Sequence, residues 1–370
     1  MCGAGFGGLE LTARLATELG DDVQITLIDR NDSFVFGFSK FDVMFARKTT
    51  HEVRHHYADI TKPGVDVRQE TIIAIDPDAR TVTTDAEIHE ADLLVVALGA
   101  DYDIGATPGL AEDGYEFYTV EGAARAGDAL RSFEGGRIVI GILGPMFKCP
   151  PAPFECAFLV HDHLVERRVR DRSQIHVVSP LPNPIPVAED TSATIVRALD
   201  DRNIAHTFGE LIDRLDPATH IATTRNGLEV GYDLFLAIPR HKAPDVVCAS
   251  GMCVDGWVPV DQTNLRTSYD GVYAVGDVAS APVPRAGVFA ENAAATVADD
   301  IIARLRGTAP PPPYEGAGSC YIEFGDGLVG KVDANFLGGP KPQAPLLGPS
   351  VEYAEEKKLF ASTRHDRWFS

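Results

Sequence analysis

A glycine run at the very start constrains this chain more than any other feature. Residues 1–8 read Met-Cys-Gly-Ala-Gly-Phe-Gly-Gly, a G-x-G-x-x-G spacing, and an amphipathic stretch follows from Leu9 to Leu19. In a dinucleotide-binding unit the glycines allow a tight turn, close approach of the backbone to a pyrophosphate, and close packing of helix on strand, while the helix N-terminus offers free N–H groups to the anion. A strand-like run from Val23 to Ile28 ends at Asp29, about 20 residues on, where an acid can hold an adenosine ribose. The spacing therefore predicts half of a βαβ nucleotide-binding unit.

The strand that should lead into this turn is short. A strand of about five residues normally precedes the glycines, but only Met1 and Cys2 stand there. Either the true chain is longer, or the sheet lacks its central strand. The lack of a signal peptide carries little weight in either case.

Composition excludes several classes of function. Lys plus Arg number 33 and Asp plus Glu 54, so the formal charge of −21 opposes binding to nucleic acid or to anionic lipid. No stretch of about 18 apolar residues exists that could span a membrane. We expect a cytoplasmic enzyme whose membrane contact is peripheral at most. The basic and aromatic tail from Lys357 to Phe369 could touch a bilayer or a quinone, but packing against the first domain is the favoured interpretation.

Alternating strand and helix patterns continue along the chain and predict an α/β fold. Short segments between Val65 and Gly99 are typical of a β-meander that returns into the sheet. A second βαβ-like unit spans Arg137 to Val178, and an apolar strand followed by a helix spans Gly271 to Arg306. A proline run at residues 310–313 marks a linker to a small α+β unit.

Two later segments resemble the paired signatures of flavoproteins with two dinucleotide-binding domains. They are Ala91 to Ala100 and Gly271 to Ala281, and the second contains the Gly276-Asp277 pair. In that superfamily the acid of the pair holds the ribityl or pyrophosphate region of FAD, which Asp277 would do here. The segment around Arg285 resembles the one where a helix N-terminus faces the flavin. The residues expected to bind FAD are Gly3, Ala4, Gly5, Phe6, Gly7, Gly8, Asp29, Arg30, Ala97, Leu98, Gly99, Gly276, Asp277, Gly287 and Val288.

The second βαβ-like unit keeps the shape of a dinucleotide module without its binding chemistry. Its turn, Gly141 to Pro151, has the wrong glycine spacing, and its prolines remove N–H groups that a pyrophosphate would need. The next strand ends in Val178-Ser179-Pro180, with no acid for a ribose. NAD(P)H is therefore disfavoured as the electron donor.

We thus expect two Rossmann-like domains, one for FAD and one of a degenerate NAD(P) type, with a C-terminal cap. The predicted FAD-binding domain comprises residues 1–110 and 244–309, the NAD(P)-type domain 111–243, and the cap 310–370.

A cysteine occupies the turn where a phosphate would bind. Cys149 precedes a predicted helix and adjoins Lys148, and both features predict a lowered thiol pKa. Six cysteines are too few for a disulfide scaffold, and they allow about 15 complete pairings. We interpret Cys2, Cys248 and Cys253 as small buried side chains, and Cys156 as core packing with an auxiliary thiol as the alternative.

The segment Cys149 to Glu155 closely resembles the cysteine segment of sulfide:quinone oxidoreductases and of the flavoprotein subunit of flavocytochrome c sulfide dehydrogenase. The segment Gly318 to Glu323 resembles the one that holds their second redox cysteine. The resemblance implies that Cys149 and Cys320 form a redox pair at FAD, that Glu155 shuttles protons, and that sulfide or a related sulfur nucleophile is the substrate. It also implies a quinone or partner redox protein as acceptor, and it is compatible with a homodimer. Residues 31–41 contain no thiol that could attach the flavin, so we expect non-covalent FAD.

Two rival functions stay open on the sequence. One is an NAD(P)H-dependent flavin, disulfide or quinone reductase, and the other is a truncated or non-catalytic flavoprotein, which the short first strand suggests. No metal site is expected. The histidines at 51, 55, 56, 161 and 163 match no zinc motif and are interpreted as solvated surface.

Overall fold

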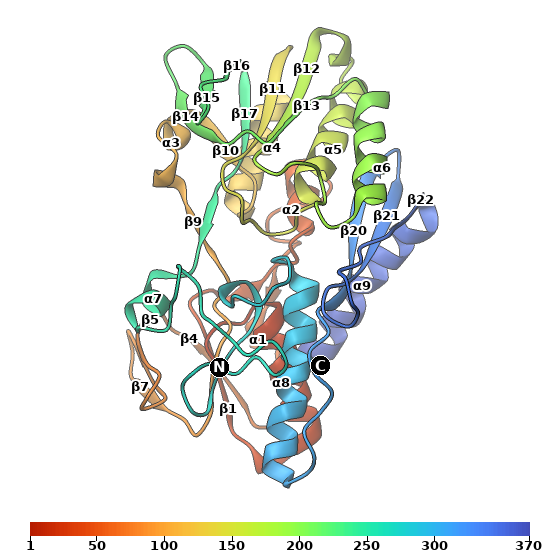
Figure 1. The fold of residues 1–370 in the computed structure, drawn as a ribbon. Coiled ribbons are helices and arrows are strands. Elements are labelled where there is room, and N and C mark those ends of the chain that lie inside the picture. Colours follow the sequence, from red (N-terminus) through yellow and green to blue (C-terminus); the bar gives the residue numbers. More distant parts are fainter.

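The computed structural model describes residues 1–370, which form two lobes joined by a pair of short strands (Figure 1). The joining strands are β9 (Asp101–Asp103) and β18 (Arg240–Lys242), which pair antiparallel. The third part of the chain, beyond α8 (Gly287–Arg306), lies beside both lobes and carries the C-terminus.

The first lobe is built on a parallel sheet with the glycine turn at its centre. Strand β1 (Ile25–Asp29) pairs with β4 (Val65–Gln69), and β8 (Leu94–Val96) pairs with β19 (Val272–Ala274). Cys2 forms bridges to both β1 and β8, so residues 1 and 2 occupy the central position of this sheet. The backbone N–H of Cys2 donates to Val95 and that of Gly3 donates to Ile28. The sheet therefore has a short central strand rather than none.

Helix α1 (Phe6–Leu19) follows this turn and packs along α8. It begins three residues earlier than the hydrophobic pattern predicted, because the glycines themselves form its first turn. Leu11 and Leu15 pack in the same apolar cluster as Val297 and Ile301 of α8. The apolar faces of two helices thus cover one side of the sheet.

The predicted meander is partly wrong. Strand β4 pairs with β1 in the main sheet, and only the next three strands form a separate antiparallel sheet. Those strands are β5 (Ile72–Asp76), β6 (Thr81–Thr84) and β7 (Ile88–Glu90). The remaining short elements of this lobe are β2 (Ser33–Phe34), β3 (His55–His56) and α7 (Asp245–Ala249), whereas α2 (Ser39–Met44) packs against α4 (Val120–Ser132) of the second lobe.

The second lobe contains a five-stranded parallel sheet in the order β10-β17-β11-β12-β13. Its central strand β11 (Gly136–Ile142) is buried and apolar from Ile138 to Ile142, as expected for a parallel sheet covered on both faces. Its other strands are β10 (Gly114–Glu116), β12 (Ser173–Ser179), β13 (Ala205–Phe208) and β17 (Leu234–Ile238). The helices of this lobe are α3 (Leu110–Asp113), α4 (Val120–Ser132), α5 (Ala152–Glu166) and α6 (Glu189–Asp201), and its small antiparallel sheet comprises β14 (Ile212–Asp216), β15 (Ile221–Thr224) and β16 (Glu229–Gly231).

The C-terminal part is an antiparallel sheet followed by one long helix. Strands β20 (Ala317–Gly325), β21 (Leu328–Asn335) and β22 (Leu346–Ser350) pair in that order. Strand β20 contacts α5 of the second lobe and α8 of the first. Helix α9 (Val351–Phe369) then contacts β21 and α1. None of the helices combines the length and the apolar character that crossing a membrane requires.

Candidate active site

The glycine turn is shaped by contacts that leave no room for a side chain. Gly3 has a left-handed φ of +100°, and a Cβ there would lie 2.5 Å from the carbonyl oxygen of Ala97. A Cβ on Gly8 would lie 1.9 Å from the carbonyl oxygen of Gly3. Gly5, by contrast, has nothing within 4 Å of such an atom and N-caps α1 without a side-chain hydrogen bond. The first N–H groups of α1 are therefore free to bind an anion.

Asp29 is held at the end of β1 by three hydrogen bonds. Its Oδ2 accepts from the N–H of Ala4 at 2.8 Å, and its Oδ1 accepts from the backbone and side-chain nitrogens of Asn31, each at 2.9 Å. These bonds orient a carboxylate that keeps further acceptor sites for ribose hydroxyls. The neighbouring Arg30 extends to Asp101, with 3.6 Å between Nη2 and Oδ1.

A cleft of about 660 Å³ joins these residues to the other predicted flavin contacts. Every residue of the predicted FAD set lines it except Ala4, which is fully buried, and Gly8, which lies against Gly3. A second uncapped helix N-terminus, Gly287 of α8, opens onto the same cleft. The cleft fits a dinucleotide. The two free helix N-termini and the crowded glycine turn suit a pyrophosphate, and the acid at the strand end suits a ribose.

Cys149 and Cys320 line this cleft together, although they come from distant parts of the chain. Cys149 adopts a left-handed φ of 54° just before α5, and its N–H donates to the carbonyl of Arg285 at 2.6 Å. Cys320 lies on β20. Both sulfurs are free thiols in this structure.

The predicted low pKa of Cys149 is wrong. Burial raises the pKa of this thiol well above its ordinary value, and the nearby Cys320 and Glu155 raise it further. Burial also raises the pKa of Cys320 to about 12. The side chain of Lys148 does not stabilise a thiolate, because its Nζ donates to the carbonyl of Ala100 at 3.0 Å and lies 4.6 Å from the ring centre of Tyr102.

The cation whose charge opposes the rise in the pKa of Cys149 is Lys357 of α9, which the sequence did not reveal. Its Nζ donates to Oε1 of Glu155 at 3.1 Å and to Oε1 of Glu323 at 2.7 Å. Arg47 closes the far end of this cluster with two bonds to Glu323, at 2.6 and 3.0 Å. Burial raises the pKa of Glu155, while Lys357 and Arg47 overcome burial and lower the pKa of Glu323 to about 2. Of the two carboxyls, Glu155 is therefore the one that more readily takes up a proton.

Aromatic rings form another wall of the cleft. Phe38, Tyr321 and Phe360 all line it. The ring centre of Phe360 lies 6.1 Å from that of Phe38 and 5.9 Å from that of Tyr321. A planar aromatic molecule can stack among such rings.

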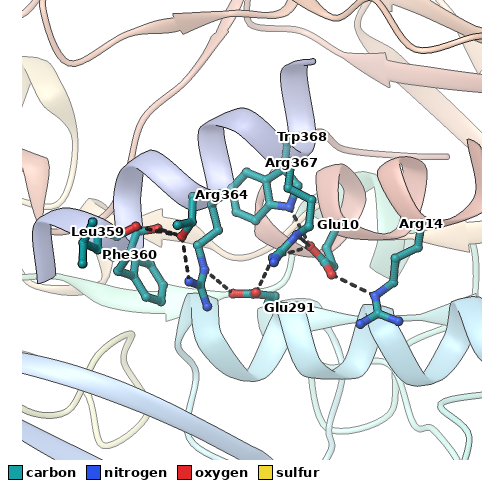
Figure 2. A network of polar contacts seen from close by, with 9 residues as sticks. Glu10, Arg14, Glu291, Leu359, Phe360, Arg364, Arg367 and Trp368 are labelled. Atoms are coloured by element: carbon teal, nitrogen blue, oxygen red, sulfur yellow. Dashed lines mark hydrogen bonds and ion pairs between the residues drawn. The ribbon is translucent and has the colours of Figure 1, made fainter. Parts of the chain in front are cut away.

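Helix α9 is fixed in place by a polar network that links it to α1 and α8 (Figure 2). Oε2 of Glu10 accepts from Nε1 of Trp368 at 2.6 Å and from Nε of Arg367 at 2.8 Å. Glu291 of α8 accepts from Nε of Arg364 at 3.1 Å. The aromatic side chain at 368 is almost fully buried, so the basic and aromatic tail packs against the first lobe as expected. The network ties α9 to both helices whose N-termini face the cleft.

Comparisons with known proteins agree with this geometry. Residues 1–296 match the family model described as pyridine nucleotide-disulphide oxidoreductase. The chain belongs to this family.

A sulfide-quinone reductase of Aquifex aeolicus is 26% identical over 355 residues, which cover 88% of this chain and 80% of that protein. The X-ray structure of the sulfide:quinone oxidoreductase of the same bacterium superposes with a TM-score of 0.87 at 22% identity, over 100% of this chain and 91% of that one. An alternative NAD(P)H-ubiquinone oxidoreductase of Arabidopsis thaliana is 24% identical over 244 residues, 59% of this chain and 45% of that protein.

This member of the pyridine nucleotide-disulphide oxidoreductase family is therefore an FAD-dependent oxidoreductase with the predicted α/β fold. The resemblance to sulfide:quinone oxidoreductases is confirmed, and the non-catalytic alternative is not supported. The domain boundaries at residues 110, 243 and 309 stay predictions.

The second Rossmann-like unit of this flavoprotein offers little to a pyrophosphate. A Cβ on Gly141 would lie 2.3 Å from the ring of Phe235, so this glycine serves packing inside the lobe. Helix α5 begins after Pro151 and has another proline, Pro153, in its first turn, so two of its leading N–H groups are missing. The buried end of β12 at Ser179 carries no acid.

Four cysteines lie outside the cleft, and two of them correct an expectation. Cys248 and Cys253 form a disulfide bond, with Cα atoms 4.9 Å apart, instead of packing as separate small side chains. Cys2 and Cys156 are fully buried free thiols and do pack in the core. The disulfide was missed because a spacing of five residues permits a bridge without indicating one.

The five histidines predicted as solvated surface are mostly half-buried. Only His51 is exposed, while His55, His56, His161 and His163 are partly covered. Burial and the charge of His365 lower the pKa of His55, because those two rings lie 4.9 Å apart at the end of α9.

Proposed function

We propose that this flavoprotein oxidises sulfide, or a related sulfur nucleophile, at Cys149 and Cys320 and passes the electrons to a quinone. The observation that carries the proposal is the meeting of two thiols from distant segments in the cleft that the FAD residues line. A pair of thiols there can cycle between a sulfur bridge and two free groups. Bound FAD supplies a two-electron acceptor beside them.

The reaction requires an oxidised bridge between the two cysteines. Sulfide attacks one sulfur of that bridge, a new S–S bond forms with the substrate sulfur, and the other cysteine leaves as a thiolate. The high pKa values of both thiols favour their protonated forms, so the leaving thiolate needs a proton donor. Glu155 lines the cleft and has a raised pKa, which suits it to give and take this proton.

A quinone acceptor is supported by the aromatic wall and by the relatives. Phe38, Tyr321 and Phe360 offer stacking surfaces for a planar ring within the same cleft. The names of two relatives include a quinone, namely the sulfide-quinone reductase of Aquifex aeolicus and the ubiquinone oxidoreductase of Arabidopsis thaliana. A small redox protein would need an exposed docking surface at the flavin instead.

The test is anaerobic mixing of the yellow holoenzyme with sulfide while the visible flavin absorption is followed. We expect sulfide to bleach the flavin and a soluble quinone to restore the colour. Cys149→Ser should abolish bleaching by sulfide, and the buried Cys156→Ser variant is the matched control that should keep it. Bleaching that is equally fast in wild type and Cys149→Ser would reject the cysteine mechanism.

An NAD(P)H-dependent quinone reductase is the second candidate, favoured by the Arabidopsis relative. The prolines at 151 and 153 and the acid-free end of β12 argue against tight nucleotide binding. NADH added in place of sulfide separates the two candidates. Fast bleaching by NADH with none by sulfide would favour this one.

A further inference from the structure

We propose that the Cys248–Cys253 disulfide is a second thiol–disulfide exchange site, which reacts with small thiols from solvent and controls the reactivity of Cys149. The bond links the end of α7 to the loop that follows it. The resemblance at Cys149 and Cys320 does not account for this pair.

The disulfide is placed where solvent reagents can reach it. Both cysteines are only half-buried. The loop around them is mostly exposed, with Gly251 and Gly256 in left-handed conformations at φ 81° and 82°. Met252 is the one buried residue of the six-residue ring and anchors it on the core of the first lobe. Disulfides that solvent reaches are the labile ones, because exchange requires a thiolate to attack one of the two sulfurs.

A short chain of contacts connects the disulfide to the active-site cysteine. Val254, next to the bridge, exchanges two backbone hydrogen bonds with Trp257, at 2.8 and 3.1 Å. The guanidinium carbon of Arg285 lies 3.7 Å from the centre of the Trp257 ring. The carbonyl oxygen of Arg285 accepts the N–H of Cys149 at 2.6 Å. Each step is a packed or hydrogen-bonded contact of the kind that can carry coupling between sites.

The loop closed by the disulfide, residues 248–253, is also connected to the strands that join the lobes and to the flavin cleft. Helix α7 directly follows β18, which is one of the two strands that join the lobes. Nε of Arg285 also donates to the carbonyl of Asp277 at 2.9 Å, so the same side chain reaches the flavin cleft. Opening the disulfide removes the covalent tie between α7 and the Trp257 segment. The turn that holds Cys149 then loses part of its support and becomes more accessible.

The exchange chemistry balances without a further reactant. A dithiol reagent reduces the bridge by giving two electrons and two protons, and it becomes a disulfide itself. Hydrosulfide opens the bridge in another way, since a new bond forms between its sulfur and one cysteine while the other cysteine leaves as a thiolate. That thiolate can attack the persulfide and expel hydrosulfide, which restores the bridge. Only the choice of hydrosulfide rests on the proposed function.

The experiment uses the Cys320→Ser holoenzyme, in which Cys149 has no partner for its own disulfide. Peptide mass mapping after alkylation measures the redox state of Cys248 and Cys253 and, separately, the alkylation rate of Cys149. We expect the pair to be bridged in air and to be opened by dithiothreitol. Opening the bridge should raise the alkylation rate of Cys149 about fivefold, which is at the low end of usual couplings between sites. Cys156, which is buried in the core, should stay unlabelled and thereby exclude global unfolding.

Two outcomes would overturn the proposal: free thiols at 248 and 253 in air, or an unchanged Cys149 rate on opening. When C248S/C253S is added to the Cys320→Ser background, Cys149 should be alkylated at the rate seen after the bridge is opened, with or without dithiothreitol. Should that protein fail to fold, the dithiothreitol comparison alone decides. A failure of the proposed function shows differently, because the dithiothreitol effect persists while sulfide fails to bleach the flavin of the wild type.

Discussion

The change Lys357→Met tests how the cleft balances its buried charges. The ammonium group of Lys357 lies between the carboxylates of Glu155 and Glu323, which are 2% and 16% exposed. Methionine keeps the long apolar stem but removes the charge that both carboxylates share. Removing one partner of a buried ion pair costs about 3–5 kcal/mol. Because Glu323 keeps its two bonds to Arg47, we expect a loss near the low end, about 3 kcal/mol of unfolding free energy.

The pH dependence gives a second and more specific readout. Burial already raises the pKa of Glu155, and Lys357 is the cation that opposes this rise. Loss of this nearby opposite charge should raise the pKa of Glu155 further. Glu155 can give a proton to the leaving thiolate only when it is protonated, so the falling limb of flavin reduction against pH should move to higher pH.

The loss of unfolding free energy in Lys357→Met should also depend on pH. A carboxyl whose folded pKa is raised contributes stability that is present below its ordinary pKa of 4.5 and is lost as the pH rises through the folded value. Glu323 has a folded pKa lowered to about 2. It therefore contributes stability that is present above its ordinary pKa of 4.5 and is lost as the pH falls toward 2. Both effects make the deficit of Lys357→Met largest at neutral pH and smaller below about pH 4.

Stopped-flow flavin reduction by sulfide and urea unfolding at several pH values measure these two effects. Lys358→Met is the matched control, since Lys358 is 72% exposed on the same helix and pairs only with Glu355. We expect the control to change stability by less than about 1 kcal/mol. If Lys357→Met gave the wild-type pH limb and the wild-type unfolding midpoint, the charge-balance reasoning would be refuted.

Three further changes probe the cofactor site, the disulfide and the C-terminal helix. If Asp277 holds FAD as predicted, Asp277→Asn should weaken FAD binding about tenfold, because a charged hydrogen bond would become a neutral one, and flavin release on dilution measures it. Removing the disulfide as C248S/C253S should lower the unfolding free energy by about 2 kcal/mol, as loop-closure entropy predicts for so short a ring, and urea unfolding checks this. Trp368→Phe should cost about 1–3 kcal/mol by leaving Oε2 of the buried Glu10 with one donor fewer, which thermal unfolding would show as a lower midpoint.

Most residues predicted to hold the flavin line one cleft, because their spacing is set locally along the chain. A glycine turn, a following helix and an acid at the next strand end are spaced by backbone geometry, so Gly3 and Asp29 could be assigned from the spacing alone. Cys149 and Cys320 were assigned by resemblance rather than by spacing, because 170 residues lie between them in the chain. Where such distant segments meet depends on the tertiary fold.

Side-chain direction was the part that the sequence could not reveal. Lys148 adjoins Cys149 in the chain, yet its ammonium group binds the carbonyl of Ala100. Lys357 lies far away in the chain, yet its ammonium group reaches Glu155. Adjacency in the sequence therefore gave the wrong cation, because the turn before α5 directs the nearer lysine toward the strands that join the lobes.

The glycines at positions 5 and 8 should fail in different ways when each is changed to alanine. A Cβ at Gly8 would lie 1.9 Å from the carbonyl oxygen of Gly3, so Gly8→Ala must shift the backbone of the turn and should destabilise the protein with or without flavin. A Cβ at Gly5 meets no protein atom within 4 Å, and the φ of −80° suits any residue. Gly5 lines the cleft, however, where a pyrophosphate must approach the backbone closely.

Gly5→Ala should therefore leave the unfolding midpoint of the flavin-free protein unchanged while it weakens FAD binding about tenfold or more. Gly8→Ala should lower that midpoint even without flavin. Thermal unfolding of the apoprotein and titration with FAD separate the two effects. An apoprotein midpoint that falls equally in both variants would show that the fifth residue serves packing, and that the anion does not approach the chain at this point.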